Sequence, residues 1–89
     1  MATGRYWVYV LRNPTGKLYI GLTEDVARRL NDQNTGQSKW TKKFGPWQLV
    51  WHDGPLSLTE ARKLENLMKR QKGGDGLLRL MNARGSTGS

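Results

Sequence analysis

Near its N-terminus the chain reads Tyr6-Trp-Val-Tyr-Val-Leu11, then Asn13-Pro-Thr-Gly16, then Lys17-Leu-Tyr-Ile-Gly21. The first run is aromatic and β-branched without polar alternation, which is typical of a strand covered on both faces. The second has the composition of a tight turn, and the third indicates another short strand. Together they predict a β-hairpin.

The pairing register of this hairpin determines whether two tyrosines meet. If Leu11 pairs with Lys17, Tyr9 lies opposite Tyr19 on one face of the hairpin. A register shifted by one residue separates the two rings, and the sequence leaves both registers open. Two phenols on one face could position or deprotonate a water molecule, but such tyrosines more often fill a core with a satisfied hydroxyl.

A helix is predicted after the hairpin. Thr23 offers an N-cap, and Glu24 and Asp25 lie in the first turn, where negative charge is favoured. We expect the helix to extend to about Gln33 and to stop at Asn34-Thr-Gly36.

The buried stripe of this helix consists of Val26 and Leu30, and Arg29 and Gln33 border it. An arginine at the edge of a core is well placed to hold a phosphate with two parallel hydrogen bonds. The alternative is a packed stem with its head group in water. Arg28 points to the solvated face, where the preceding acidic residues can pair with it.

The remaining chain predicts one more strand and two helices. Trp47-Gln-Leu-Val-Trp-His52 alternates as a strand does, and Asp53-Gly-Pro55 is expected to close it. Ser57-Leu-Thr-Glu60 is a capping box that starts a helix running to about Gln71, and Leu77 to Met81 predicts a last short helix. The order strand, strand, helix, strand, helix predicts a small α+β domain on a three-stranded, mostly antiparallel sheet.

Length and composition narrow the class of protein. The 89 residues suffice for one small domain, which we assign to residues 6–83, with a flexible start at 1–5 and a disordered tail at 84–89. The absence of cysteine excludes thiolate metal sites, thiol nucleophiles and disulfide-rich scaffolds. The longest apolar run, Tyr6 to Leu11, is far shorter than the roughly 20 residues that span a bilayer. Without a leader sequence, we expect a cytoplasmic protein with no membrane partner.

Charge favours a polyanionic partner. Fifteen Lys and Arg residues against seven Asp and Glu give a net charge of +8, which suits nucleic acid, although a soluble basic protein without such a partner is the alternative. The acidic residues are scattered and His52 is the only histidine. This argues against a site with two metals or several histidines, so any chemistry uses one metal ion or none.

The long helix has a carboxylate, Glu65, inside its apolar arc. The arc consists of Leu58, Ala61, Leu64, Leu67 and Met68. A carboxylate that faces a core is costly unless a metal ion or an arginine compensates it. The alternative is that Glu65 lies at the rim and pairs with Arg62 or Lys69 at helical spacing.

Basic residues form two clusters that suit a DNA-facing surface. The first mixes charge with aromatic rings that can stack on bases, in Lys39, Trp40, Lys42, Lys43 and Phe44. The second covers the outer face of the long helix, in Arg62, Lys63, Lys69, Arg70 and Lys72. Charge runs of this kind more often form an ordinary solvated face.

In this order, the motifs resemble the GIY-YIG nuclease superfamily. Trp7-Val-Tyr9 and Tyr19-Ile-Gly21 look like its two signature tripeptides, the second as a literal match. Arg29 lies ten residues after Tyr19, in a segment similar to the helix that carries the family's arginine. Glu65 falls where the family places its metal-binding glutamate. The resemblance spans about Tyr6 to Arg79. It is strongest to the small single-domain bacterial members of the superfamily.

The resemblance implies a DNA endonuclease, acting in repair or processing, that uses a single Mg²⁺ or Mn²⁺ ion and leaves a 5′-phosphate and a 3′-hydroxyl. Glu65 would bind the ion, Arg29 the phosphate, and Tyr19 would position the water or phosphate. Tyr9 would accept the proton of the attacking water. A free phenol titrates near pH 10, so this role requires Arg29 or Lys17 to lower the pKa of Tyr9. We also expect Lys17 and Lys69 to contact nucleic acid.

One departure from the family pattern keeps a second reading open. Many members have a histidine four residues after the arginine, where this chain has Gln33, and His52 is not its equivalent. The alternative function is therefore a catalytically silent nucleic-acid-binding module on the same fold, and a weaker one is an RNA-binding protein. The sequence leaves open whether the substrate is single-stranded, branched or duplex, and whether the chain is a monomer or a dimer.

Overall fold

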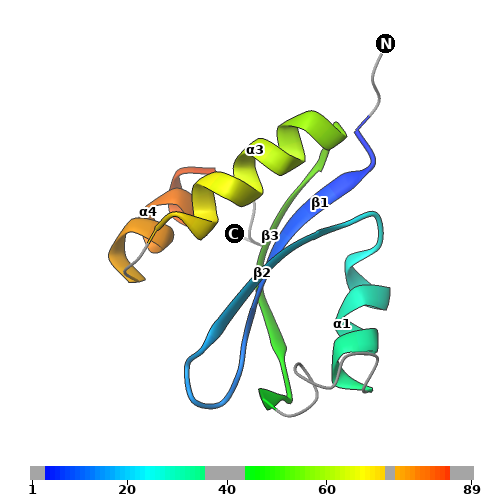
Figure 1. The fold of residues 1–89 in the computed structure, drawn as a ribbon, viewed down its shortest axis with the longest axis vertical. Coiled ribbons are helices and arrows are strands. Elements are labelled where there is room, and N and C mark those ends of the chain that lie inside the picture. The colour runs from blue at the N-terminus through cyan, green and yellow to red at the C-terminus, as the bar shows by residue number, and fades with distance from the viewer. Residues whose placement is uncertain (1–3, 36–43, 72–73, 85–89) are drawn as a thin grey trace.

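The computed structural model describes residues 4–35, 44–71 and 74–84. Its elements are, in order, β1 (Tyr6–Arg12), β2 (Leu18–Thr23), α1 (Val26–Asn34), β3 (Gln48–Leu56), α3 (Leu58–Lys69) and α4 (Gly74–Arg84) (Figure 1). The predicted α+β class and element order are confirmed. The last helix, predicted over Leu77 to Met81, is longer than expected and forms α4. None of the described helices is long and apolar enough to cross a bilayer.

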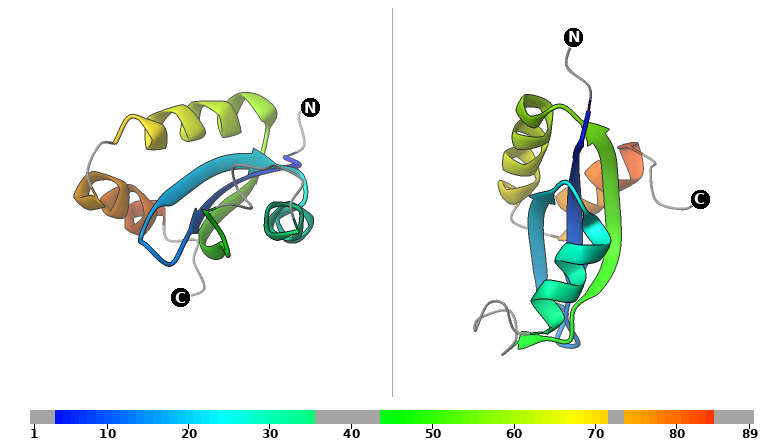
Figure 2. Two further views of the ribbon diagram at one scale, coloured as in Figure 1. Left: turned by 60° about the horizontal axis from the view of Figure 1, so that its bottom comes forward. Right: turned by 90° about the vertical axis from the view of Figure 1, so that its right-hand side faces the viewer.

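The three strands form one antiparallel sheet in the order β2-β1-β3. Figure 2 shows α3 and α1 on opposite faces of this sheet, with the edge strand β2 running between the two helices. Side chains alternate along the central strand, so Val8 and Val10 face α3 while Tyr9 and Leu11 face α1. Both faces of β1 are covered, which explains its unbroken apolar run.

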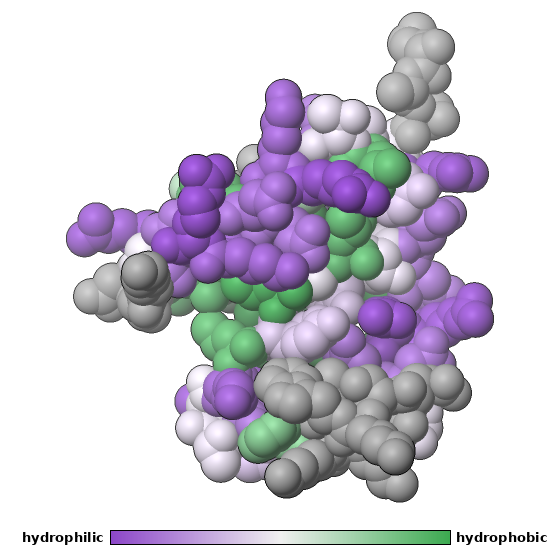
Figure 3. Space-filling view, viewed as in Figure 1, coloured by the Kyte–Doolittle hydropathy of each residue, from purple (hydrophilic) through white to green (hydrophobic). Residues whose placement is uncertain are grey.

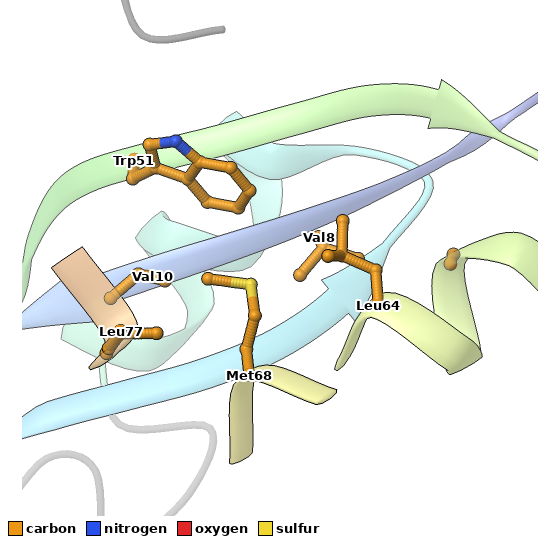
Figure 4. Packing of buried hydrophobic residues seen from close by; sticks show 7 residues of the cluster. Val8, Val10, Trp51, Leu64, Met68 and Leu77 are labelled. Atoms are coloured by element: carbon orange, nitrogen blue, oxygen red, sulfur yellow. The ribbon is translucent and has the colours of Figure 1, made fainter. Parts of the chain in front are cut away.

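The larger core lies between the sheet and the helices α3 and α4 (Figure 4). Its buried members are Val8, Val10, Trp51, Ala61, Leu64, Met68 and Leu77. The indole Nε1 of Trp51 donates to the backbone oxygen of Met81 at 3.1 Å, which ties α4 to β3. The apolar arc predicted for α3 is narrower in the structure, because Leu58 and Leu67 at its margins are each 40% exposed.

A smaller core lies between the sheet and α1. It is built from Tyr9, Leu11 and Trp47, with partly buried side chains packed against them, namely Tyr19, Val26, Leu30, Phe44 and Leu49. Asn34 clamps the end of α1 to the start of β3, since its Nδ2 donates to the Trp47 backbone oxygen at 3.0 Å and its Oδ1 accepts from the Trp47 backbone N–H at 2.7 Å. This clamp sets the position of α1 over the sheet.

The start of α1 differs from the prediction. Asp25, not Thr23, is the N-cap, and its side chain accepts from the Arg28 backbone N–H at 3.0 Å. Thr23 is the last residue of β2, and its hydroxyl accepts from the Asp25 backbone N–H at 3.1 Å. The pairing of β2 with β1 extends to Thr23 and delays the helix by two residues. At α3 the predicted capping box of Ser57 and Glu60 is confirmed.

Strand β3 continues past the predicted end at Asp53-Gly-Pro55 and runs to Leu56. Two features permit this: Gly54 adopts φ +151°, and β3 is an edge strand, where a proline is tolerated because one side of the strand makes no ladder bonds. The register with β1 shifts between Tyr6 and Val8, so this stretch of β3 is irregular.

Candidate active site

The hairpin brings two tyrosines onto the α1 face of the sheet. Tyr9 pairs with Gly21 and Leu11 with Tyr19, so neither register considered from the sequence is correct. The observed pairing is shifted by two residues from the Leu11–Lys17 alternative, and a shift of two keeps Tyr9 and Tyr19 on the same face. Their rings stack with centroids 6.3 Å apart and an interplanar angle of 28°.

Helix α1 adds two polar side chains to this pair. Arg29 Nε and Gln33 Nε2 each donate to the Tyr9 hydroxyl at 3.4 Å. They lie one helical turn apart, so both reach the same oxygen. Tyr9 and Gln33 are buried, with 1% and 3% exposure, whereas Arg29 is exposed. The site therefore places the hydroxyl of a buried tyrosine next to a cation that solvent and ligands can reach.

The pKa of the Tyr9 phenol differs from what its proposed role as a proton acceptor requires. Burial raises the pKa of Tyr9 above the usual value of 10, and the hydrogen bond from Arg29 opposes that rise without cancelling it. Arg29 thus lowers this pKa as expected, but the net pKa of Tyr9 in the free protein is still raised, because loss of hydration penalises the phenolate more than the cation stabilises it. The bond to Tyr9 raises the pKa of Arg29, which keeps its positive charge.

Strand β3 places His52 directly across from Tyr9. Cross-strand partners share a face, and the His52 ring packs edge-on against Trp7 with centroids 5.3 Å apart. Sequence reasoning did not connect His52 with the tyrosines. No local signal could have done so, because the connection depends on the β1–β3 register, which contains two irregularities.

The structure does not bring Glu65 into contact with the residues around Tyr9. Glu65 lies on α3, against the other face of the sheet, and its carboxylate Oε2 is 3.2 Å from Lys69 Nζ. The Glu65 side chain is 18% exposed, so it lies at the rim of the core. Its partner Lys69 is one of the two basic residues that the sequence analysis named as the alternative to a metal ion. Among the described residues there is no group of three or more acidic or histidine side chains placed to hold a metal ion.

Basic side chains lie at two places around the domain. The Lys17 ammonium is 4.7 Å from the centroid of the Phe44 ring at the turn end of the sheet. Helix α3 and its C-cap carry four exposed basic residues, Arg62, Lys63, Lys69 and Arg70, and Figure 3 shows hydrophilic side chains gathered over this helix. The predicted contacts at Lys39, Trp40, Lys42 and Lys43 lie outside the described residues.

The order of these features matches a known domain. A family model described as the GIY-YIG catalytic domain matches residues 5–76. The chain belongs to the GIY-YIG family. Membership of this nuclease family implies a nucleic acid substrate, and it confirms the resemblance drawn from the tyrosine tripeptides, Arg29 and Glu65.

Relatives match this chain over about two thirds or more of their own length. It is 40% identical over 67 residues to a UPF0213 protein of Pectobacterium carotovorum, with 74% of this chain and 68% of the relative covered. A UPF0213 protein of Streptococcus agalactiae is 41% identical over 66 residues, covering 73% and 75%. The solution NMR structure of a UPF0213 protein from Bacillus halodurans superposes with a TM-score of 0.57 at 30% identity, covering 92% of this chain and 87% of that one.

Proposed function

We propose that this chain is a divalent-metal-dependent endonuclease that hydrolyses phosphodiester bonds in DNA, leaving a 5′-phosphate and a 3′-hydroxyl, in DNA repair or processing. The observation that carries the proposal is the bond between Arg29 Nε and the Tyr9 hydroxyl at 3.4 Å, beside the stacked ring of Tyr19. A cation supported by two phenols, in a GIY-YIG chain with a net charge of +8, suits a phosphodiester.

Arg29 is the phosphate-binding group in this proposal. Its Nε is used by Tyr9, and the terminal N–H groups of an exposed guanidinium remain to neutralise the non-bridging oxygens. Arg29 also borders a surface cleft of about 490 Å³ whose lining includes Glu24, Asp25 and Asp32 and neither Tyr9 nor Tyr19. Those carboxylates repel a phosphate, so we place the phosphate on the side of Arg29 that carries the tyrosines.

The tyrosines act through their hydroxyl groups. Tyr19 orients the attacking water or the phosphate. For Tyr9, the raised pKa favours a phenol that keeps its proton and forms hydrogen bonds over a phenol that removes a proton from water. This changes the role expected of Tyr9 from the family resemblance, and it follows from the burial of its ring.

The metal ion is assigned to Glu65. A single carboxylate is enough for a hard ion such as Mg²⁺ or Mn²⁺, which takes one or two protein carboxylates and fills its other positions with water and phosphate oxygens. Lys69 Nζ, 3.2 Å from Glu65 Oε2, would have to move aside for the ion. When bound, such an ion polarises the phosphate and stabilises the leaving 3′ oxygen. Because Glu65 and Arg29 lie on helices on opposite faces of the sheet, we infer that the substrate crosses the edge formed by β2, which runs between them (Figures 1 and 2).

The second candidate is a nucleic-acid-binding module without activity. Gln33, which cannot exchange a proton, stands beside Tyr9 and favours this candidate. Incubation of the protein with labelled single-stranded, duplex, flap and nicked DNA, with Mg²⁺ or Mn²⁺ and with EDTA, separates the two. Cleavage that EDTA abolishes supports the endonuclease, whereas binding without cleavage of every substrate supports the silent module.

A further inference from the structure

Gln33 is a buried polar side chain with half of its amide unpaired. It is 3% exposed, its Nε2 donates to the Tyr9 hydroxyl at 3.4 Å, and its Oε1 is buried without a hydrogen-bond partner among the described residues. An unpaired buried carbonyl destabilises the folded state. A leucine would fill a similar volume without that cost, so packing alone does not explain this glutamine.

The hydrogen bond from Gln33 to the Tyr9 hydroxyl offers an explanation for a glutamine at this position. The phenol oxygen accepts from both Arg29 and Gln33, and it has two acceptor sites. With both sites used, the O–H of Tyr9 is the group left to interact with a bound phosphate or water. An amide neither takes up nor releases a proton near neutral pH, and it is the Nε2–H group of Gln33 that donates to the phenol oxygen. Gln33 can therefore hold the hydroxyl without competing for its proton.

We propose that Gln33 is a positioning residue that holds the Tyr9 hydroxyl as a hydrogen-bond donor to the substrate. The substrate part of this inference rests on the proposed nuclease function. The titratable groups that face Tyr9 are Arg29 from α1, Tyr19 from β2 and His52 from β3. Gln33 adds no titratable group to this set, so the pH dependence of cleavage at the site does not include a proton equilibrium at residue 33.

The first experiment examines the free protein and needs no activity. Tyrosine labelled with ¹³C at Cζ gives three signals, because the chain has three tyrosines. In Gln33→Leu the Tyr9 signal should titrate about half a pH unit or more above that of the wild type, because one hydrogen bond to the phenolate is lost. The Tyr9 shift at neutral pH should also change, and the unfolding midpoint should stay equal or rise because the unpaired carbonyl is removed.

A matched control lies on the same helix. Asn31 is exposed on α1, and Asn31→Leu should leave the Tyr9 signal and its titration at the wild-type values. If Gln33→Leu lowers the unfolding midpoint while the Tyr9 signal and titration stay unchanged, Gln33 is a packing residue and the proposal is overturned.

The second experiment uses cleavage. Gln33→His places a titratable ring near Tyr9, and it should change the pH–rate profile between about pH 5 and 7 relative to that of the wild type. Identical profiles for the wild type and Gln33→His would overturn the positioning role. If the wild type cuts no DNA at all, the nuclease proposal and the substrate role fall, while the NMR titration still decides whether Gln33 controls the Tyr9 hydroxyl.

Discussion

The ring of Tyr9 occupies the space that a side chain on Gly21 would need. The two residues are cross-strand partners in the hairpin, and a β-carbon built on Gly21 would lie 2.6 Å from Tyr9 Cζ. The glycine of the Tyr-Ile-Gly tripeptide thus lets the first tyrosine lie flat across the second strand. The close contact between Tyr9 and Gly21 therefore links the two signature tripeptides.

The first prediction concerns Gly21→Ala. Tyr9 is 1% exposed and has no room to move away, so we expect the substitution to destabilise the fold by about 1–3 kcal/mol. Urea unfolding measures this change. In a Tyr9→Ala background the cost of Gly21→Ala should nearly vanish, and an undiminished cost there would contradict the steric explanation.

The second prediction compares two neighbouring arginines. Arg29→Ala should lower the cleavage rate by about 100-fold or more, because it removes the cation proposed to neutralise the phosphate. Arg28→Ala, which removes another exposed arginine, one whose Nε lies 3.9 Å from the Asp32 carboxylate, should change the rate by less than about threefold. Equal losses in the two variants would show that only general positive charge matters.

The third prediction is a pH dependence of stability. The folded-state pKa of Tyr9 is raised, so above about pH 10 the unfolded chain ionises this phenol while the folded chain keeps its proton. The unfolded state then binds fewer protons than the folded state, and stability falls with rising pH. Urea midpoints between pH 8 and 11 should fall less steeply in Tyr9→Phe than in the wild type, and parallel curves would refute the assigned shift.

The fourth prediction tests the ion pair of α3. Glu65→Gln should abolish metal-dependent cleavage without unfolding the domain, since the side chain lies at the rim of the core. Lys69→Ala removes the cation 3.2 Å from Glu65, which would compete with a bound ion, so the half-saturating Mg²⁺ concentration should fall by up to about fivefold. A higher Mg²⁺ requirement in Lys69→Ala would speak against Glu65 as the ligand.

The fifth prediction concerns the basic outer face of α3. If this face contacts the DNA backbone, Lys63→Ala should weaken binding of all sequences alike and reduce the slope of log K against log salt by about 1. Asn66→Ala changes an exposed neutral residue of the same helix and serves as the control. An unchanged slope in Lys63→Ala would show that the DNA backbone does not contact this face of α3. Tighter binding of RNA than of DNA at matched salt would favour the RNA-binding alternative.

Local signals predicted the start of a helix correctly where one capping motif decides where the helix begins. The capping box at Ser57 and Glu60 started α3 as expected. At α1, by contrast, both Thr23 and Asp25 can cap a helix, and strand pairing selected between them because Thr23 is held in the ladder with Trp7. Similarly, Gly54 and Pro55 read as a strand end, but the edge position of β3 allows the strand to pass through them.

The sequence by itself determined the family, the element order and the residue types from which a site could be built, because capping, turn and alternation signals act over a few residues. Tertiary structure alone decided which of those residues meet. The hairpin register put Tyr9 beside Tyr19, and the packing of α1 brought Arg29 and Gln33 to one hydroxyl. The burial that results raises the pKa of Tyr9, since hydration of a side chain depends on every element packed around it.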